Sequence, residues 1–208
     1  MSPSTFQLPE SVSGFHDYFR MSGETDEVLA ALGYAHTVAP LTLPAGDATG
    51  QWVDDLRARI DDVLPLISLG NETARREALV APILLELTRR LQARLRFEYP
   101  ISVSPLLRGN LDYLMTATGT LLVVEAKFAD VTHGFTQLAA QLVALDAITN
   151  AETPVLYGAV TVGDVWRFGV LDRARKRVSQ DTNQFRVPTD LAELLAALVG
   201  IVQGVAAA

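Results

Sequence analysis

The sequence predicts an α/β domain in which a mixed β-sheet is flanked by helices on both sides. Two observations indicate this class. Helix-like and strand-like hydrophobic patterns follow one another in the order helices, three strands, a helix, two strands and a closing helix. The chain has 208 residues, of which 49% are hydrophobic and 20% charged, and this length and composition allow one complete hydrophobic core.

The N-terminal third is expected to form a cap on that core. Residues 25–32 and 52–64 have the hydrophobic spacing of helices, and each ends at a helix-stopping glycine or proline. No clear linker separates this part from the rest of the chain. We therefore divide the chain into residues 1–65, an N-terminal arm and helical cap packed on the core, and residues 66–208, the core.

Residues 71–95 have the pattern of one long helix. Asn71 is a suitable N-cap, and Glu72 follows it in the first turn, where the helix dipole favours an acid. Arg76 falls within the apolar stripe of this helix. Pro82 is expected to kink the helix in its middle.

The chain from residue 109 to residue 127 is expected to form a β-hairpin. Its first half alternates apolar and polar positions, its second half is an apolar β-prone run, and the Thr-Gly pair at residues 118–119 is suited to a turn. A two-residue turn at that pair would place Asp112 directly opposite Glu125. Lys127 would project from the same face as Glu125.

Two opposed carboxylates require a compensating cation. Directly opposed side chains in a hairpin have Cβ atoms about 4.5–5.5 Å apart, and like charges at that distance are destabilising. The next pair on this face, Leu114 with Val123, is apolar. A hard divalent ion with oxygen ligands fits between Asp112 and Glu125. Lys127 would add positive charge and a donor for a reacting oxygen.

The rest of the sequence supplies the remaining elements of the α/β order. Residues 135–148 are expected to be a helix that carries Gln137 and Gln141 one turn apart on one face. The other expected elements are strands at residues 96–103, 155–162 and 165–171 and a closing helix at residues 188–202.

The composition excludes several classes of protein. The absence of cysteine excludes disulfides and thiolate metal sites, and the three histidines lack the spacing of a zinc site. A net charge of −7 argues against a large nonspecific phosphate-binding surface. The N-terminus does not resemble a signal peptide, and the apolar run at residues 191–208 is expected to pack as a terminal helix. We therefore expect a cytoplasmic protein that does not enter a membrane.

An Asp on one strand, followed by Glu-x-Lys on the next, resembles the PD-(D/E)xK nuclease superfamily. The matching residues are Asp112, Glu125 and Lys127, and Leu111 stands where the superfamily name has proline. The segments FHDYFR and GETDEVLAALGY nearer the N-terminus are similar to those of uncharacterised small bacterial proteins of this type.

The resemblance extends beyond the hairpin to about residues 69–171, half of the chain. NETARREALVAPIL, at residues 71–84, is similar to the N-terminal helix of the nuclease domain of type I restriction motor subunits. In those domains an acid on this helix joins the active site, and it corresponds to Glu72; Arg76 and Pro82 also match. Further similarities are Gln137, Gln141 and the strand pair at residues 156–171.

The resemblance implies a restriction-endonuclease-like core and a metal-dependent active site. Mg²⁺, with Mn²⁺ as a substitute, would be held by Asp112, Glu125 and the backbone carbonyl of Ala126. The metal would polarise the scissile phosphate and activate water. Lys127 would stabilise the attacking hydroxide or the charge of the phosphorane-like state. Glu72 would be an acid linked to the metal.

Each of these residues also has an interpretation without catalysis. The two strand acids could be solvent-facing, and Lys127 could form an ordinary salt bridge with one of them. Glu72 could act only on the helix dipole, an effect of about 0.3–1 kcal/mol. Gln137 and Gln141 could orient their helix against the site, contact a nucleic-acid backbone, or form a polar helix face. Arg76 is expected to pair with an acid near the site.

The leading hypothesis is a Mg²⁺-dependent nuclease that hydrolyses phosphodiester bonds of DNA. The alternatives are a non-catalytic binding module with a nuclease fold, or a subunit of a defence or repair assembly. The pI of about 4.9 supports the binding module, as does the lack of a DNA-recognition motif such as a helix-turn-helix. For the oligomeric state, the sequence allows either a homodimer or a larger assembly.

Overall fold

An eight-stranded mixed β-sheet runs through the computed structural model, which describes residues 6–117, 120–127, 130–149 and 153–206. The strands are β1 (Ala35–Ala39), β2 (Arg94–Ser102), β3 (Arg108–Ala117), β4 (Thr120–Ala126), β5 (Val155–Thr161), β6 (Val165–Asp172), β7 (Arg177–Asp181) and β8 (Phe185–Arg186). The helices are α1 (Phe15–Phe19), α2 (Thr25–Ala31), α3 (Gln51–Val63), α4 (Glu72–Arg75), α5 (Ala81–Leu91), α6 (Val131–Ile148) and α7 (Leu191–Gln203). Two short turns accompany them, the 3-10 turn η1 (Leu64–Leu66) and the π-helical turn η2 (Arg76–Val80).

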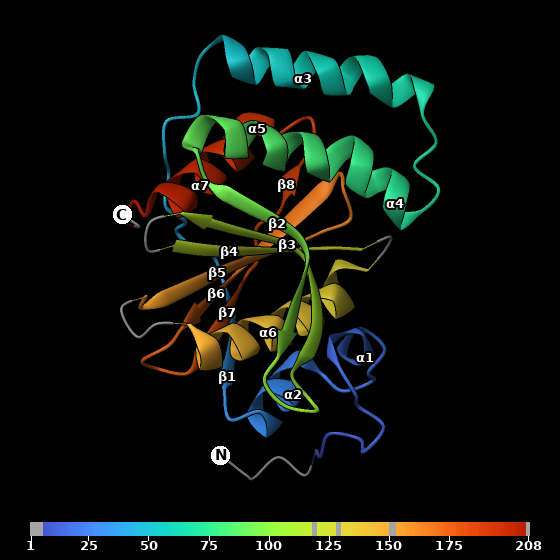
Figure 1. Ribbon diagram of the computed structural model, residues 1–208, viewed down its shortest axis with the longest axis vertical. Helices are drawn as coiled ribbons and strands as arrows, with labels where there is room; N and C mark the ends of the chain where they lie inside the picture. The colour runs from blue at the N-terminus through green and yellow to red at the C-terminus, as the bar shows by residue number, and fades with distance from the viewer. Residues whose placement is uncertain (1–5, 118–119, 128–129, 150–152, 207–208) are drawn as a thin grey trace.

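Helices cover both faces of the sheet, which confirms the predicted α/β class. Figure 1 shows α1, α2 and α6 on one face and α3, α4, α5 and α7 on the other. The strand order is β1-β7-β6-β5-β4-β3-β2, and β8 pairs with β6. The pairs β4–β5 and β1–β7 are parallel, and α6 is the crossover between β4 and β5. The other pairs are antiparallel, so the sheet is mixed.

The sheet is larger than the five strands that the sequence predicted. The additional strands are β1, β7 and β8, which are short and largely polar or exposed. In particular β1 belongs to the N-terminal third of the chain and pairs with β7 at one edge, with Ala35 opposite Arg177. Part of residues 1–65 is thus a strand of the central sheet.

The predicted long helix at residues 71–95 is divided into three pieces. Asn71 is the N-cap as predicted, because its side chain accepts a hydrogen bond of 2.8 Å from the backbone N–H of Ala74. The helical run is continuous, but it is not regular α-helix throughout. The π-helical turn η2 comes first, and Pro82 then lies in the first turn of α5, where a proline ring is tolerated. The helix ends at Leu91, so β2 begins earlier than expected.

The β3–β4 hairpin has the register that the sequence predicted. Leu114 lies opposite Val123, and Tyr113 lies opposite Val124. The turn pair at residues 118–119 lies outside the described residues. Because side chains alternate along a strand, the face that carries Val123 also carries Glu125.

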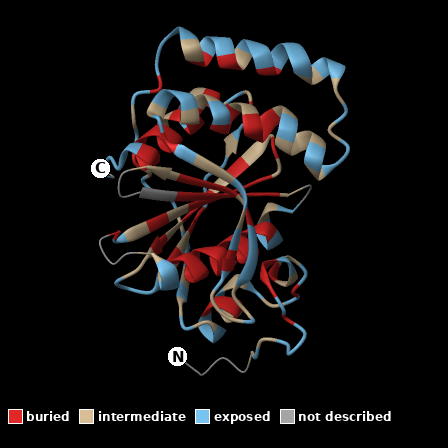
Figure 2. Cartoon of the chain, viewed as in Figure 1, coloured by how far each residue is buried: buried red, intermediate tan, exposed pale blue. Residues whose placement is uncertain are grey.

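Each face of the sheet has its own hydrophobic core. Figure 2 shows buried residues concentrated in the strands and in the inner helices, whereas α3 is largely exposed on its outer side. Helix α6 is buried without interruption from Gly134 to Leu145. Helix α7 packs against β3 and β4, so the predicted terminal helix is confirmed. Within the described ranges, no helix has the length and apolar character needed to span a bilayer.

Candidate functional site

The carboxylate pair lies where the β3–β4 hairpin register predicted it. Asp112 and Glu125 follow the Tyr113–Val124 pair as the next opposed positions of the hairpin. The Oδ2 atom of Asp112 accepts a hydrogen bond of 2.8 Å from the backbone N–H of Ala126. The side chain of Asp112 therefore reaches across to the strand end that carries Glu125.

Glu125 is buried and surrounded by donors. Only 1% of its surface is exposed. Its Oε1 atom accepts a hydrogen bond from Gln137 and lies 2.6 Å from the Nζ atom of Lys127, and its Oε2 atom accepts a hydrogen bond from Gln141. Both glutamines come from α6, one helical turn apart, so this helix and the strand together fix the carboxylate.

The side-chain amides of both glutamines are oriented by their hydrogen bonds to Glu125. Their Nε2 atoms face the carboxylate, which leaves the Oε1 atoms of Gln137 and Gln141 buried without a hydrogen-bond partner in the described part of the chain. An unsatisfied buried polar atom costs free energy, about 1–3 kcal/mol when a partner is removed. Both residues are buried, so the interpretation of a polar, exposed helix face does not apply.

Burial and mutual repulsion raise the pKa of both acids. Burial is the largest cause for Glu125, followed by the charge of Asp112, and together they raise its pKa to about 7 against the opposing effects of Lys127 and Gln141. Burial also raises the pKa of Asp112, although the Ala126 N–H and Lys127 act in the opposite direction. The pair thus titrates nearer to neutral pH than ordinary carboxyl groups do.

Lys127 supplies positive charge beside Glu125. Burial alone would lower its pKa, but the charge and hydrogen bond of Glu125, with further contributions from Asp112 and Glu72, raise the pKa above its ordinary value. Lys127 is therefore an ammonium ion at neutral pH. Its Nζ atom also lies 5.3 Å from the ring centre of Phe19, which comes from α1.

Arg76 lies beside Asp112 and is held by a glutamate that sequence reasoning missed. Its Nη2 atom lies 2.9 Å from the Oε1 atom of Glu98, and its Nη1 atom lies 3.7 Å from the Oδ1 atom of Asp112. The guanidinium also lies over the ring of Tyr113, 5.2 Å from its centre. The first residue of the π-helical turn η2 thus provides the counter-ion of Asp112.

Glu98 lies in β2 at the position opposite Asp112, between the pairs Phe97–Tyr113 and Tyr99–Leu111. Its φ angle of 47° is in the left-handed region, an unfavourable conformation that is enriched at functional sites. Glu98 is the sole acid in the nine residues of β2, and that was the available sequence signal. Only the register of β2 on β3 establishes that Glu98 lies opposite Asp112.

Glu72 borders a cavity of about 400 Å³ whose lining includes neither Asp112 nor Glu125 but does include two residues that contact Glu125. Lys127 and Gln137 line the same cavity, so Glu72 and Lys127 share its wall. Asp130, the N-cap of α6, also lines the cavity, as do residues of α1 and its end, which sequence reasoning missed. The residues from this N-terminal segment are His16, Phe19 and Arg20.

The donor set at the pair suits a hard divalent cation, although its acids already have cationic partners. Asp112 and Glu125 offer carboxylate oxygens, which are the ligands that Mg²⁺ prefers, and Mg²⁺ commonly uses one or two carboxylates together with water and phosphate. In the described residues no group of three or more acidic, histidine or cysteine side chains is arranged to hold a metal ion. Lys127 and Arg76 neutralise the pair in this structure.

Comparison with known proteins adds no relative. No protein-family model matches the chain, and a search of curated proteins gave no match. The fold and the site are those of a mixed α/β domain with a carboxylate pair at the end of a β-hairpin, in which buried Glu125 is paired with Lys127 and Asp112 is half-buried.

Proposed function

We propose that the chain is a Mg²⁺-dependent nuclease that hydrolyses phosphodiester bonds of DNA, with Mn²⁺ as a substitute metal. The observation that carries the proposal is the set formed by Asp112, Glu125 and Lys127 at the end of one hairpin, of which Lys127 lines an open cavity. We also infer that the mixed sheet, with its β4–α6–β5 crossover, is a restriction-endonuclease-like core.

Asp112, Glu125 and the backbone carbonyl of Ala126 would hold Mg²⁺, whose chemistry there is to polarise the scissile phosphate and to lower the pKa of a bound water. Lys127 holds a proton on Nζ and donates a hydrogen bond to the attacking water or to a phosphate oxygen. This role requires the ammonium form, in agreement with its raised pKa.

The other residues of the site would act on these three. Gln137 and Gln141 fix the orientation of Glu125 through its two oxygens. Arg76 compensates part of the charge of Asp112, and its ion pair with Glu98 holds the guanidinium in place beside that acid. Glu72, on the cavity wall with Lys127, helps to hold the lysine charged and directed toward the substrate.

A second candidate function is a non-catalytic binding module, alone or as a homodimer or subunit of a larger assembly. One observation favours it. Both oxygens of Glu125 already have partners within the chain: Oε1 accepts from Gln137 and pairs with Lys127, and Oε2 accepts from Gln141. In such a module the buried pair would be structural, and neither Mg²⁺ nor Mn²⁺ would bind at Asp112.

The test is cleavage of supercoiled plasmid and of single-stranded DNA, with RNA as a third substrate, in the presence of Mg²⁺ or Mn²⁺. The wild type is expected to cut DNA, and Lys127→Ala is expected to lower the rate about 100-fold or more, as the loss of one transition-state donor does. Lys176→Ala, which removes a lysine that packs on Tyr34 away from the site, is the matched control. Equal cleavage by wild type and Lys127→Ala would refute the proposed site, and intact DNA under all conditions would favour the binding module.

A further inference from the structure

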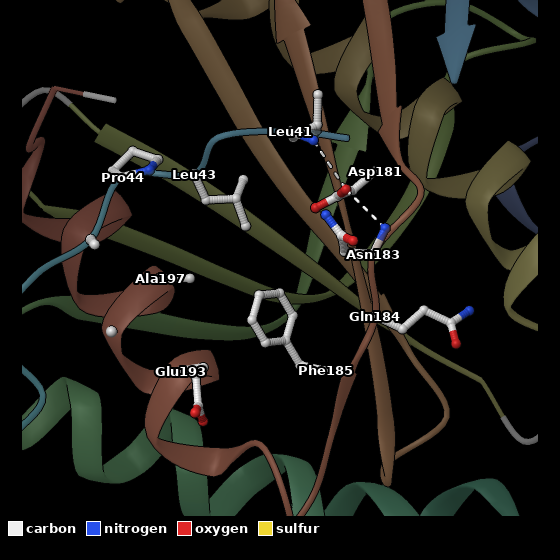
Figure 3. A pocket seen from close by; sticks show the side chains of 11 residues that line it. Leu41, Leu43, Pro44, Asp181, Asn183, Gln184, Phe185, Glu193 and Ala197 are labelled. Atoms are coloured by element: carbon white, nitrogen blue, oxygen red, sulfur yellow. Dashed lines mark hydrogen bonds between the residues drawn. The ribbon is translucent and has the colours of Figure 1, made fainter. Parts of the chain in front are cut away.

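A second cavity lies away from the carboxylate pair, between α7, the loop that precedes α3 and the chain that follows β7. Its volume is about 440 Å³, and we call it the α7 pocket. Figure 3 shows its apolar walls, to which Leu43, Pro44, Phe185 and Ala197 contribute. This pocket takes no part in the proposed nuclease chemistry.

One wall of the α7 pocket is a buried carboxylate. Only 1% of the surface of Asp181 is exposed. Its Oδ1 atom accepts backbone hydrogen bonds from Leu41 at 3.1 Å and from Asn183 at 2.9 Å. Among the described residues, its Oδ2 atom has neither a hydrogen-bond donor nor a cation. Figure 3 shows this second oxygen turned away from the two amides and toward the space beside Leu43.

The charges around the pocket have one sign. Glu193, in the first turn of α7, adds a second carboxylate to the lining, and no lysine, arginine or histidine of the described residues lines the pocket. A buried carboxylate without a cation is costly, because it has lost its hydration and gained no partner of opposite charge. A ligand that completes this site must therefore bring a positive charge to Asp181.

The walls also specify the rest of the ligand. A divalent metal ion needs about six or more oxygen ligands, whereas this pocket offers the Oδ2 atom of Asp181 and the exposed carboxylate of Glu193 in a lining that is mostly apolar. An aliphatic chain would instead be desolvated against Leu43 and Phe185, and apolar walls with a few fixed polar groups are typical of small-molecule sites. Charge and shape together favour an organic cation.

We propose that the α7 pocket binds a small organic ammonium ion with an aliphatic body. The ammonium group donates to the Oδ2 atom of Asp181, and its carbon chain packs between the loop at Leu43 and the ring of Phe185. The two backbone amides hold Oδ1 and so fix the carboxylate in the orientation that the ligand needs.

The test is an NMR titration of the full chain with n-pentylammonium chloride, followed through the backbone amides of Leu41 and Asn183, which report directly on Asp181. We expect saturating shifts of both amides with a dissociation constant of about 1 mM or below. The probe 1-pentanol, which has the same chain without the charge, is expected to bind about 10- to 100-fold more weakly, the range for loss of one charge-assisted hydrogen bond. Non-saturating shifts, or equal affinity for the two probes, would overturn the proposal.

Two variants locate the binding. Asp181→Asn keeps an oxygen that can accept from the two amides and removes the charge, so it should weaken pentylammonium binding about 10- to 100-fold and leave 1-pentanol unaffected. Ala196→Leu fills part of the pocket without touching the carboxylate and should abolish binding of both probes. Asp47→Asn, a change outside the pocket lining in the same loop, is the matched control. If Asp181→Asn does not fold, the Ala196→Leu variant tests the proposal alone. Binding of pentylammonium to that variant with the affinity of the wild type would contradict the proposal.

Discussion

At the scale of single residues, the site contains two acids and two cationic side chains that compensate their charge. Glu125 is paired with Lys127, and Asp112 with Arg76, so each acid of the pair has a cationic side chain beside it. This arrangement explains how opposed carboxylates persist without a metal. It also means that a divalent cation must compete with side chains that are already in place.

Gln141 is expected to be important for stability because it is the donor to the Oε2 atom of Glu125. It is fully buried, and Gln141→Leu would leave that oxygen without a hydrogen bond. We expect a loss of about 1–3 kcal/mol in the free energy of unfolding at pH 8, measured by urea denaturation. Gln203→Leu, on the exposed end of α7, should change the free energy by less than about 0.5 kcal/mol. A Gln141→Leu protein as stable as the wild type would show that this hydrogen bond contributes nothing.

The raised pKa of Glu125 predicts how metal affinity depends on pH. Burial and the charge of Asp112 raise this pKa to about 7, so below pH 7 a proton occupies the carboxyl group and must leave when a metal binds. The dissociation constant for Mn²⁺ is therefore expected to fall as pH rises from 6 to 7, by up to about tenfold, and to level off above that. Calorimetric titrations at pH 6, 7 and 8 measure this. An affinity that is constant over the range would contradict the assignment of Glu125 as a ligand.

At the scale of elements, the sequence could predict what is local and strongly patterned. The hairpin register followed from alternation and one turn pair, and it correctly placed Asp112 opposite Glu125. Strands β1 and β7 could not be predicted in the same way. β1 is mostly exposed, and β7 reads RVSQD, in which the buried residues include polar Gln180 and Asp181. Their pairing brings together segments far apart in the chain, which no local hydrophobic pattern encodes.

The candidate site was partly predictable for the same reason. The acids and the lysine lie within one hairpin, and the glutamines are one helical turn apart, so short-range periodicity was sufficient to group them. Glu98 and Phe19 reach the site only through the pairing of β2 with β3 and the packing of α1. The burial that raises the pKa of Glu125 likewise depends on the packed α6.

The contact between α7 and the loop before α3 predicts the effect of a glycine substitution. A Cβ atom on Gly200 would lie 2.6 Å from the backbone of Pro44, and a Cβ atom on Gly46, in the same loop, would lie 2.8 Å from the backbone nitrogen of Gly200. Helix propensity alone would predict that Gly200→Ala stabilises α7 by about 1 kcal/mol. Because backbone cannot yield at this distance, we instead expect a loss of about 1–3 kcal/mol.

Thermal and urea unfolding of the Gly200→Ala protein measure this effect. Gly70→Ala serves as the control, since a Cβ there would meet only the Ser68 side chain at an ordinary distance of 3.4 Å. A Gly200→Ala protein more stable than the wild type would mean that the loop moves away from α7 freely.

At the scale of the whole molecule, the N-terminal third is joined to the rest by the sheet and by both cores. Strand β1 pairs with β7, and α1 packs on α6. Buried side chains of this third also enter the two hydrophobic clusters. They include Phe15, Tyr18, Leu29, Leu56 and Ile60.

Deletion of residues 1–65 is therefore expected to abolish cooperative folding of what remains. The deletion would expose both faces of the sheet and remove an edge strand, a loss well beyond the usual net stability of a domain, about 5–15 kcal/mol. Urea denaturation followed by circular dichroism tests this expectation. A cooperative transition at the wild-type midpoint would show instead that residues 66–208 are an independent core.

The most direct test of the central claim is to count the Mn²⁺ ions that bind the protein by electron paramagnetic resonance, in the wild type and in Asp112→Asn. The account predicts one Mn²⁺ bound per chain at pH 8 and an affinity lower by about tenfold or more in Asp112→Asn, because one of two charged ligands is lost. Asp54→Asn, on the exposed side of α3, should bind as the wild type does. Absence of Mn²⁺ binding, or equal binding by wild type and Asp112→Asn, would contradict the claim that this carboxylate pair is a metal site.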